Sequence, residues 1–410
     1  MQVTIEKVIY GGDGLVRTEQ GVIFVPRTAP GDVVDVEITE RKKDYAKGRV
    51  LKVVKPSPDR QETDCPNYMM AGCCHWEHIR YDRQLEHKEA IVRESLKRLG
   101  KIDFAGTIKR ISGPDHAYRL RASFHVRDGR LGFLRENSHY FVNVSRCSAL
   151  VPEINAFIPA MNAVLDREAL SVDVVAGTTG LAATLTFDAE VERPWQRYRD
   201  IMFENIPGLA ALTFVIGGRR LHYAKHAVEI EAAGFKFGLS SNAFFQANRF
   251  LLTPFIHEVV AQAGQGSARV LDLFCGAGFF SIPLAHVSRQ LIGVESSRDA
   301  VKQAEENARA NGVLNAEFAA GQVETAVQGT VVEPDLVLLN PPRTGAGAKV
   351  AELIGGLKAR RLVYVSCNPT TFAREVVVFA RLGYSLKQLT MLDQFPNTYH
   401  IELIGQLELE

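Results

Sequence analysis

The 410-residue chain has no uninterrupted apolar run long enough to cross a membrane. Its first residues, MQVTIEKVIYGGDG, lack both the basic start and the apolar segment of a secretory signal. We therefore expect no signal peptide, no contact with a membrane, and a cytoplasmic location.

The chain also lacks an excess of charge of either sign, with 48 Lys and Arg against 47 Asp and Glu. Net charge thus neither indicates nor excludes a nucleic-acid partner. Locally the balance differs, because residues 101–150 hold nine Lys and Arg against four Asp and Glu. In that segment Arg119, Arg121, His125 and Arg127 recur at near-alternate positions. This pattern fits a strand face that contacts phosphates, and it fits ordinary surface residues about equally.

Cysteines are few, six in all, and their spacing does not suit a disulfide framework. Cys65, Cys73 and Cys74 fall within ten residues, and Cys147 follows. Thiols this dense in a cytosolic chain indicate a metal centre or chemistry rather than crosslinks. The residues alone leave zinc and an iron–sulfur cluster both open.

The length favours several domains, and the pattern of elements suggests three. Residues 1–58 show short alternating strands with glycine turns, typical of an OB-like β-barrel that adds RNA affinity rather than chemistry. The stretch PSPDR at 56–60 would be the linker. Residues 59–238 would form a central α+β domain with the cysteines. Residues 239–410 alternate strands and helices, which predicts a doubly wound, seven-stranded sheet closed by an antiparallel hairpin.

Cys367 ends the apolar strand VYVS, and Asn368-Pro369 then turns the chain. Ligands bind at the carboxyl ends of strands in open α/β sheets, so this position suits a nucleophile. Most lone cysteines are small buried hydrophobes, however, and position alone leaves both interpretations open.

The stretch DLFCGAG at 272–278 lies between a predicted strand and a predicted helix. Its glycines, Gly276 and Gly278, let a ligand approach the backbone and the helix N-terminus. Glu295 ends the next strand, where a carboxylate can accept hydrogen bonds from a ribose diol. Together with Asn340-Pro341-Pro342 and a terminal hairpin, this pattern favours an S-adenosylmethionine (SAM) fold over a dinucleotide fold.

With these motifs the chain resembles the RNA 5-methyluridine methyltransferases, uracil-C5 enzymes with a TRAM domain and an iron–sulfur cluster. The resemblance runs through the TRAM-like start, the cysteine cluster, GFLRENSHYFVNVSRCSALVPEIN, LSSNAFFQANRF, DLFCGAGFFSIPLA, NPPR, SCNP and HIELIGQLE. It implies SAM-dependent C5-methylation of a uridine in RNA, with SAM and a [4Fe–4S] cluster as cofactors. It also implies a monomer that binds RNA but not DNA.

The resemblance assigns Cys367 as the nucleophile and Glu402 of HIEL as the general base. The chemistry agrees, because a thiolate that adds to uracil C6 makes C5 nucleophilic, and a base must then remove the C5 proton. The SAM contacts that it implies are Gln246 of FFQAN, Phe274, Gly276, Gly278, Glu295 and Asn340. The cluster ligands that it implies are Cys65, Cys73, Cys74 and Cys147.

Three positions depart from the family pattern. Asn340 stands where many relatives have Asp, and members of the large-subunit rRNA branch read NPPR. This favours 23S rRNA as the target, with the tRNA T-loop uridine as the alternative. Phe279 stands where other members often have Asn or Gly, so it is not among the expected SAM contacts. The usual cysteine spacing is Cys-x5-Cys-x2-Cys, whereas here Ala71 takes the second position and Cys73 would replace it.

Two other classes share part of this pattern. SAM enzymes that methylate exocyclic amines also have Asn-Pro-Pro, but they need an aromatic residue next, where this chain has Arg343. A non-catalytic iron–sulfur RNA-binding protein would need neither the SAM contacts nor Cys367 with Glu402. SAM binding would separate that class from an enzyme.

Overall fold

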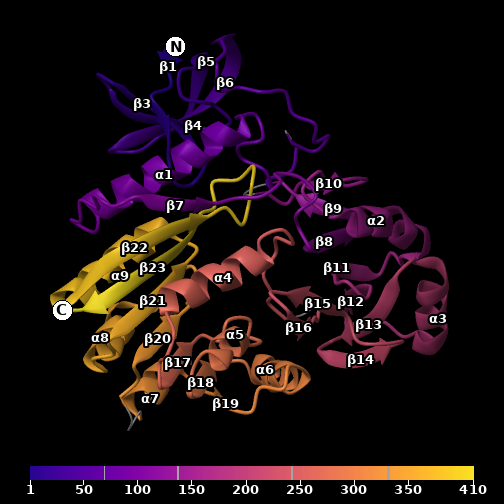
Figure 1. The fold of residues 1–410 in the computed structure, drawn as a ribbon. Helices are drawn as coiled ribbons and strands as arrows, with labels where there is room; N and C mark the ends of the chain where they lie inside the picture. The colour runs from indigo at the N-terminus through magenta and orange to yellow at the C-terminus, as the bar shows by residue number, and fades with distance from the viewer. Residues whose placement is uncertain (69, 136–137, 242, 330–332) are drawn as a thin grey trace.

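The computed structural model describes residues 1–68, 70–135, 138–241, 243–329 and 333–410. Within these residues the strands form sheets of six, seven and eight strands and one two-stranded hairpin (Figure 1). The predicted multi-domain α/β class is confirmed. In the described part of the chain, no helix has the length and apolar character needed to span a membrane.

The N-terminal sheet surrounds a small core that includes Val25, Val34 and Val36. The short alternating strands expected here number six in the structure, and Ile5 and Glu6 separate the first two of them. The strands lie side by side in the order β1-β5-β6-β4-β3-β2. Along the chain they are β1 (Gln2–Thr4), β2 (Lys7–Val8), β3 (Gly14–Thr18), β4 (Gly21–Val25), β5 (Val33–Arg41) and β6 (Tyr45–Lys55).

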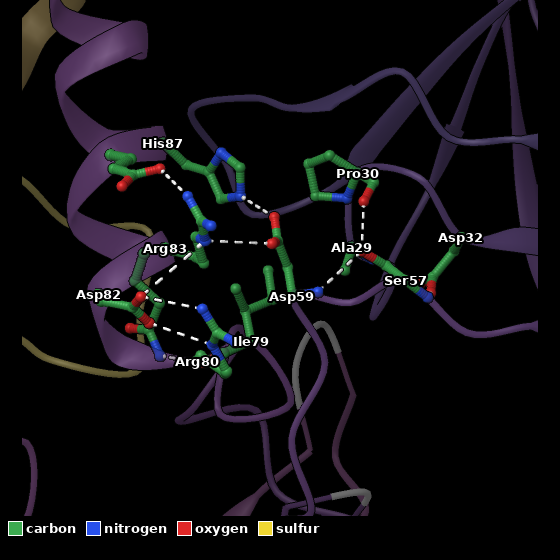
Figure 2. A network of polar contacts seen from close by, with 12 residues as sticks. Ala29, Pro30, Asp32, Ser57, Asp59, Ile79, Arg80, Asp82, Arg83 and His87 are labelled. Carbon is green, nitrogen blue, oxygen red and sulfur yellow. Dashed lines mark hydrogen bonds and ion pairs between the residues drawn. The ribbon is translucent and has the colours of Figure 1, made fainter.

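The PSPDR linker after β6 is fixed at both ends by polar contacts (Figure 2). The Ser57 amide donates to Oδ1 of buried Asp32 over 2.8 Å. Asp59 forms an ion pair with Arg83 of α1 (Tyr81–Arg98), with 3.3 Å between Oδ1 and Nε. The linker therefore joins the N-terminal sheet firmly to α1.

The seven-stranded sheet is mixed, because β12 and β13 are parallel and their neighbours pair antiparallel. Apolar residues of α2 (Pro152–Val164), such as Phe157 and Met161, complete its core, and α3 (Trp195–Asn205) contributes Met202. A hairpin of β15 (Glu229–Ala232) and β16 (Phe235–Gly238) follows the sheet. The strands lie side by side in the order β10-β9-β8-β11-β12-β13-β14. Along the chain they are β8 (Arg121–Arg127), β9 (Arg130–Leu134), β10 (Phe141–Asn143), β11 (Ala169–Ala176), β12 (Leu181–Phe187), β13 (Leu209–Ile216) and β14 (Arg219–Ala224).

The predicted cationic face of β8 is only partly available to a ligand. Arg121 donates to the carbonyls of Ala243 (2.7 Å) and Ser241 (3.1 Å), so it supports the loop after β16. His125 and Arg127 remain exposed. One of the predicted phosphate-binding side chains therefore has an internal role that alternation could not reveal.

The eight-stranded sheet contains all seven predicted strands and one more, β7 (Ile108–Ile111), which lies parallel to β22. Helix α1 packs its apolar side, including Ile91 and Val92, into the same core as Phe372 and Val376 of α9. Thus β7 and α1, from the segment predicted as a central domain, complete the C-terminal sheet. The strands of this sheet lie side by side in the order β19-β18-β17-β20-β21-β23-β22-β7. Along the chain the remaining strands are β17 (Arg269–Leu273), β18 (Gln290–Glu295), β19 (Ala316–Ala320), β20 (Leu336–Leu339), β21 (Arg361–Ser366), β22 (Tyr384–Leu392) and β23 (Glu402–Leu409). The helices of this part are α4 (Leu252–Ala263), α5 (Ser281–His286), α6 (Arg298–Ala310), α7 (Val323–Gln328), α8 (Ala348–Gly356) and α9 (Pro369–Arg381).

The central strands of this sheet explain why their sequences are apolar throughout. All four residues of β20 are at most 1% exposed, and Leu362 to Val365 of β21 are fully buried. Helices cover both faces of such a strand, so neither face can be polar. Asn340, Ser366 and Cys367 accordingly lie at the ends of β20 and β21, where the site described next is formed.

Candidate active site

The carboxyl ends of four parallel strands bring the predicted site residues to one edge of the sheet. Strands β18, β17, β20 and β21 are neighbours and run parallel. Glu295 ends β18, Phe274 follows β17, Asn340 follows β20 and Cys367 follows β21. The topology therefore gathers residues that lie far apart in the chain.

The glycine loop after β17 leaves its backbone open on one side. Phe274 has φ 63° and Gly276 has φ 55°, both in the left-handed region. A Cβ atom placed on Gly276 would meet no heavy atom within 4 Å, so a ligand can approach that backbone. Positive φ at the non-glycine Phe274 is uncommon, and such strain concentrates at functional sites.

The Glu295 carboxylate links this loop to the start of α6. Its Oε2 accepts from the Gly276 amide (3.2 Å), and its Oε1 accepts from the Ser297 amide and the Ser296 hydroxyl (2.9 Å each). A carboxylate has about four acceptor positions, so Oε2 retains capacity for a donor such as a ribose hydroxyl. The half-buried Asn340 is held beside this loop by its main-chain N–H, which donates to Leu273 O over 3.2 Å.

Gln246 is held at the same edge by an aromatic cluster and a second glutamine. Its neighbour Phe245 packs against Phe279 with ring centroids 5.3 Å apart, and Phe279 is 7% exposed. The Gln394 amide group donates to Gln246 Oε1 over 3.4 Å. Phe279, which was not among the expected SAM contacts, thus serves as a core residue that supports the FFQAN loop.

The SCNP turn is fixed by the Asn368 side chain. Asn368 is the N-cap of α9, and its Oδ1 accepts from the amides of Thr370 (3.0 Å) and Thr371 (3.4 Å). Its Nδ2 donates to Arg343 O over 3.2 Å. One side chain therefore begins the helix and ties the NPPR loop to the loop that contains Cys367.

Glu402 lies beside Cys367, because Leu403 of β23 pairs with Ser366 of β21. Glu402 is 7% exposed, and burial raises the pKa of its carboxyl group to about 8, with Arg343 acting in the opposite direction. Burial and the neighbouring Glu402 raise the pKa of the Cys367 thiol to about 11, and Arg343 again opposes the shift. An acid, a thiol and a cation therefore influence one another at this edge.

Three residues at the site were not predicted from sequence. Arg343 approaches His400, with 3.5 Å between Nη2 and Nε2. Tyr10, in the turn between β2 and β3, donates from its hydroxyl to Cys367 O over 3.3 Å. Arg343 could have been inferred, since it follows NPP at the end of a strand adjacent to β21. Tyr10 gives no local signal, because its contact depends on the docking of a distant segment.

Four cysteines of the predicted cluster set lie in one neighbourhood. Cys65 and Cys74 pack together with Tyr68 and against Cys73. Burial raises the pKa of the Cys147 thiol to about 12, with smaller contributions from the adjacent Cys73 and Cys65. All four are free thiols. Within the described residues, however, no set of three or more His, Cys, Asp and Glu side chains is grouped as a metal site requires.

Comparison with known protein families gives two matches that together cover most of the chain. Residues 80–408 match the tRNA (Uracil-5-)-methyltransferase family, and residues 1–51 match the TRAM domain. The resemblance inferred from the motifs is therefore confirmed at the level of the family.

Individual relatives match over nearly their whole length. An uncharacterized RNA methyltransferase of Aquifex aeolicus is 32% identical over 100% of this chain and 99% of its own. The 23S rRNA (uracil(1939)-C(5))-methyltransferase RlmD of Vibrio cholerae (strain M66-2) is 33% identical over 98% of this chain and 94% of its own.

A solved structure has the same arrangement of domains. The Pyrococcus abyssi tRNA (uracil-54, C5)-methyltransferase in complex with S-adenosyl-L-homocysteine superposes with a TM-score of 0.78 and 25% identity, over 99% of this chain and 100% of that protein. The protein described here therefore belongs to the tRNA (uracil-5-)-methyltransferase family, carries an N-terminal TRAM domain, and is a SAM-dependent RNA (uracil-5-)-methyltransferase.

Proposed function

We propose that this enzyme methylates C5 of a uridine in 23S rRNA through a covalent bond between Cys367 and the base. The observation that carries this proposal is the grouping of Cys367, Glu402 and Arg343 at the same sheet edge as the open glycine loop. A uracil held there would have a thiol, a carboxyl group and a cation within reach.

Cys367 would act first. The raised pKa of Cys367 keeps its thiol protonated near neutral pH. Because the thiolate is the form that reacts and is oxidised, protonation protects the sulfur from oxidation before substrate binds. Arg343 favours the thiolate, so the partly exposed thiol would release its proton to solvent as sulfur bonds to C6. The electron pair of the C5–C6 bond then moves toward the C4 carbonyl, and C5 becomes nucleophilic.

Glu402 would act after methylation. With a pKa of about 8, it is partly ionised under mildly alkaline conditions and can accept the C5 proton. Loss of that proton restores the C5–C6 double bond and breaks the bond to sulfur, which frees Cys367. Glu402 therefore determines whether the adduct is released.

SAM, when bound, supplies a methyl group activated by its sulfonium charge. The open side of Gly276 and the remaining acceptor capacity of Glu295 suit its amino-acid and ribose portions. We assign its binding to Gln246, Phe274, Gly276, Gly278, Glu295 and Asn340.

The 23S rRNA target is supported by the similarity to the Vibrio cholerae enzyme and by Asn340 in NPPR. The tRNA T-loop is the second candidate, supported by the Pyrococcus abyssi enzyme. Mass mapping of 5-methyluridine in both RNAs from a deletion strain decides between them. Loss of the modification in tRNA alone would contradict the rRNA assignment.

We also propose that Cys65, Cys73, Cys74 and Cys147 hold a [4Fe–4S] cluster. Four thiolates are the donor set that such a cluster requires, and these four side chains influence one another in a single region. Bound there, the cluster would tie residues 65–74 to Cys147, so its contribution would be structural. Chemistry at uracil needs none of these thiols.

The covalent mechanism is tested with two substitutions and methyl-labelled SAM. Cys367→Ala should abolish both methylation and adduct. Glu402→Gln should accumulate a labelled protein–RNA adduct that survives denaturing electrophoresis, because attack and methylation proceed while proton removal fails. A 5-fluorouridine RNA should trap the wild-type enzyme, since fluorine cannot leave as a cation.

The matched control is Glu408→Gln, which makes the same change at the other end of β23, where Glu408 pairs with Arg361 over 2.7 Å. It should turn over without accumulating adduct. Normal turnover by Glu402→Gln, or an adduct formed by Cys367→Ala, would refute the assigned roles.

A further inference from the structure

We propose that the TRAM domain supplies a positioning residue to the active site, Tyr10, whose hydroxyl group holds the main chain of Cys367 for attack on the base. The inference rests on the proposed nucleophilic role of Cys367. It adds a catalytic contribution to a domain whose sequence predicted RNA affinity alone.

Tyr10 contacts both chain segments that form the catalytic pair. Its hydroxyl donates to Cys367 O over 3.3 Å. Its ring meets the ring of Tyr399 edge-on, with centroids 5.5 Å apart and an interplanar angle of 87°. Tyr399 packs in turn on His400, two residues before Glu402, at 4.4 Å. Tyr10 thus lies between the end of β21 and the loop that leads into β23.

The turn after Tyr10 is shaped for this close approach. Gly12 has φ 96°, and a Cβ atom there would lie 3.0 Å from Tyr399 and 3.2 Å from His75. Its carbonyl accepts from Nε1 of the fully buried Trp76 over 2.9 Å. Only glycine combines this conformation with this contact distance. The TRAM turn is therefore packed into the methyltransferase core.

The electrostatic surroundings of Tyr10 agree with this placement. Burial raises its pKa to about 12, the thiol of Cys367 and the carboxyl group of Glu402 add to the shift, and Arg343 opposes it. The hydroxyl therefore remains a hydrogen-bond donor over the whole working pH range. The same groups that tune the catalytic pair act on this ring, which excludes a purely peripheral location.

The hydrogen bond to Cys367 O fixes the orientation of the peptide group that follows the nucleophile. That orientation sets the direction of the Cys367 side chain, and covalent attack requires alignment to within about 0.5 Å. Without the hydroxyl, the half-buried carbonyl loses its donor and the loop gains freedom. The expected consequence is slower bond formation with unchanged RNA affinity.

The test is Tyr10→Phe, which removes the hydroxyl and keeps the ring. At saturating 5-fluorouridine RNA, we expect the rate constant of adduct formation to fall about tenfold, equivalent to about 1.4 kcal/mol. The dissociation constant for unmodified RNA and its dependence on salt should stay within twofold of wild type, because no phosphate contact is changed. Gly12→Ala, which displaces the turn, should slow adduct formation in the same way.

The matched control is Tyr384→Phe. The Tyr384 hydroxyl also donates to a backbone carbonyl, Ala359 O, over 2.8 Å, but at the opposite end of the same sheet. Tyr384→Phe should lower the stability of the protein about as much as Tyr10→Phe does and leave the rate of adduct formation unchanged. A wild-type rate for Tyr10→Phe, or an effect on RNA affinity alone, would overturn the inference. Failure of the wild-type enzyme to form any adduct would instead remove the proposed function on which the inference rests.

Discussion

The buried carboxyl group of Glu402 makes the stability of this protein depend on pH in a direction that can be worked out from the structure. Burial raises its pKa from 4.5 to about 8 in the folded state. Below pH 4.5 the folded and unfolded chains both carry the proton. As the pH rises toward 8, the unfolded chain releases the proton while the folded chain keeps it, so the contribution of Glu402 to folding becomes progressively less favourable.

The size of this effect follows from the same shift. At about 1.4 kcal/mol per pKa unit, a pKa raised from 4.5 to about 8 corresponds to about 5 kcal/mol. Local relaxation and entering water reduce such penalties, so we expect roughly 2 to 5 kcal/mol. Glu402→Gln removes the ionisable group and keeps the shape. The variant should therefore gain stability over wild type by that amount at pH 9 and show little gain at pH 5.

Urea unfolding at pH 5, 7 and 9 measures this difference, with Glu408→Gln as control. Ion pairing with Arg361 lowers the pKa of Glu408, so ionised Glu408 stabilises the folded state, whereas ionised Glu402 destabilises it. Glu408→Gln should therefore be slightly less stable than wild type at pH 7 and 9. The reasoning is refuted if the gain of Glu402→Gln does not increase between pH 5 and 9.

Two further predictions concern the active site and the cysteines. Arg343→Gln should move the pH dependence of adduct formation toward higher pH, because Arg343 lowers the pKa of both Cys367 and Glu402. Arg343→Lys keeps the positive charge and should keep most of the wild-type pH profile. An unshifted profile for Arg343→Gln would contradict the role given to the Arg343 charge. Protein purified without oxygen should contain iron and sulfide with broad visible absorbance, and Cys147→Ser should lose both; stoichiometric zinc in place of iron would rule out the cluster.

The parts of the fold that the sequence predicted share one property, which is that their signals are local. The apolar runs of β20 and β21 identified buried parallel strands, and neighbouring parallel strands end at a common edge. That rule alone is enough to place Asn340 and Cys367 near each other. Glu402 was assigned through the resemblance to the family, and the structure puts it at the start of the terminal strand, β23.

The parts that could not be predicted depend on contacts between distant segments. Nothing in the residues of β7 indicates that it pairs with β22, and nothing near Tyr10 indicates that it reaches Cys367. Arg121 illustrates a second limit. Alternation correctly placed it on a strand face, but only the structure shows that its guanidinium group donates to the carbonyls of Ser241 and Ala243.

The pairing of β7 with β22 also determines the order in which the chain can complete its fold during synthesis. Leu389 pairs with Ile108, about 280 residues earlier in the chain. At about 5 to 20 residues per second, a ribosome needs roughly 15 to 60 seconds to make the intervening segment. Through that interval β7 and the apolar side of α1 have no partner strand or helix. The nascent chain must therefore keep an unpaired strand soluble until its last sheet hairpin emerges, which makes this segment a natural substrate for chaperones.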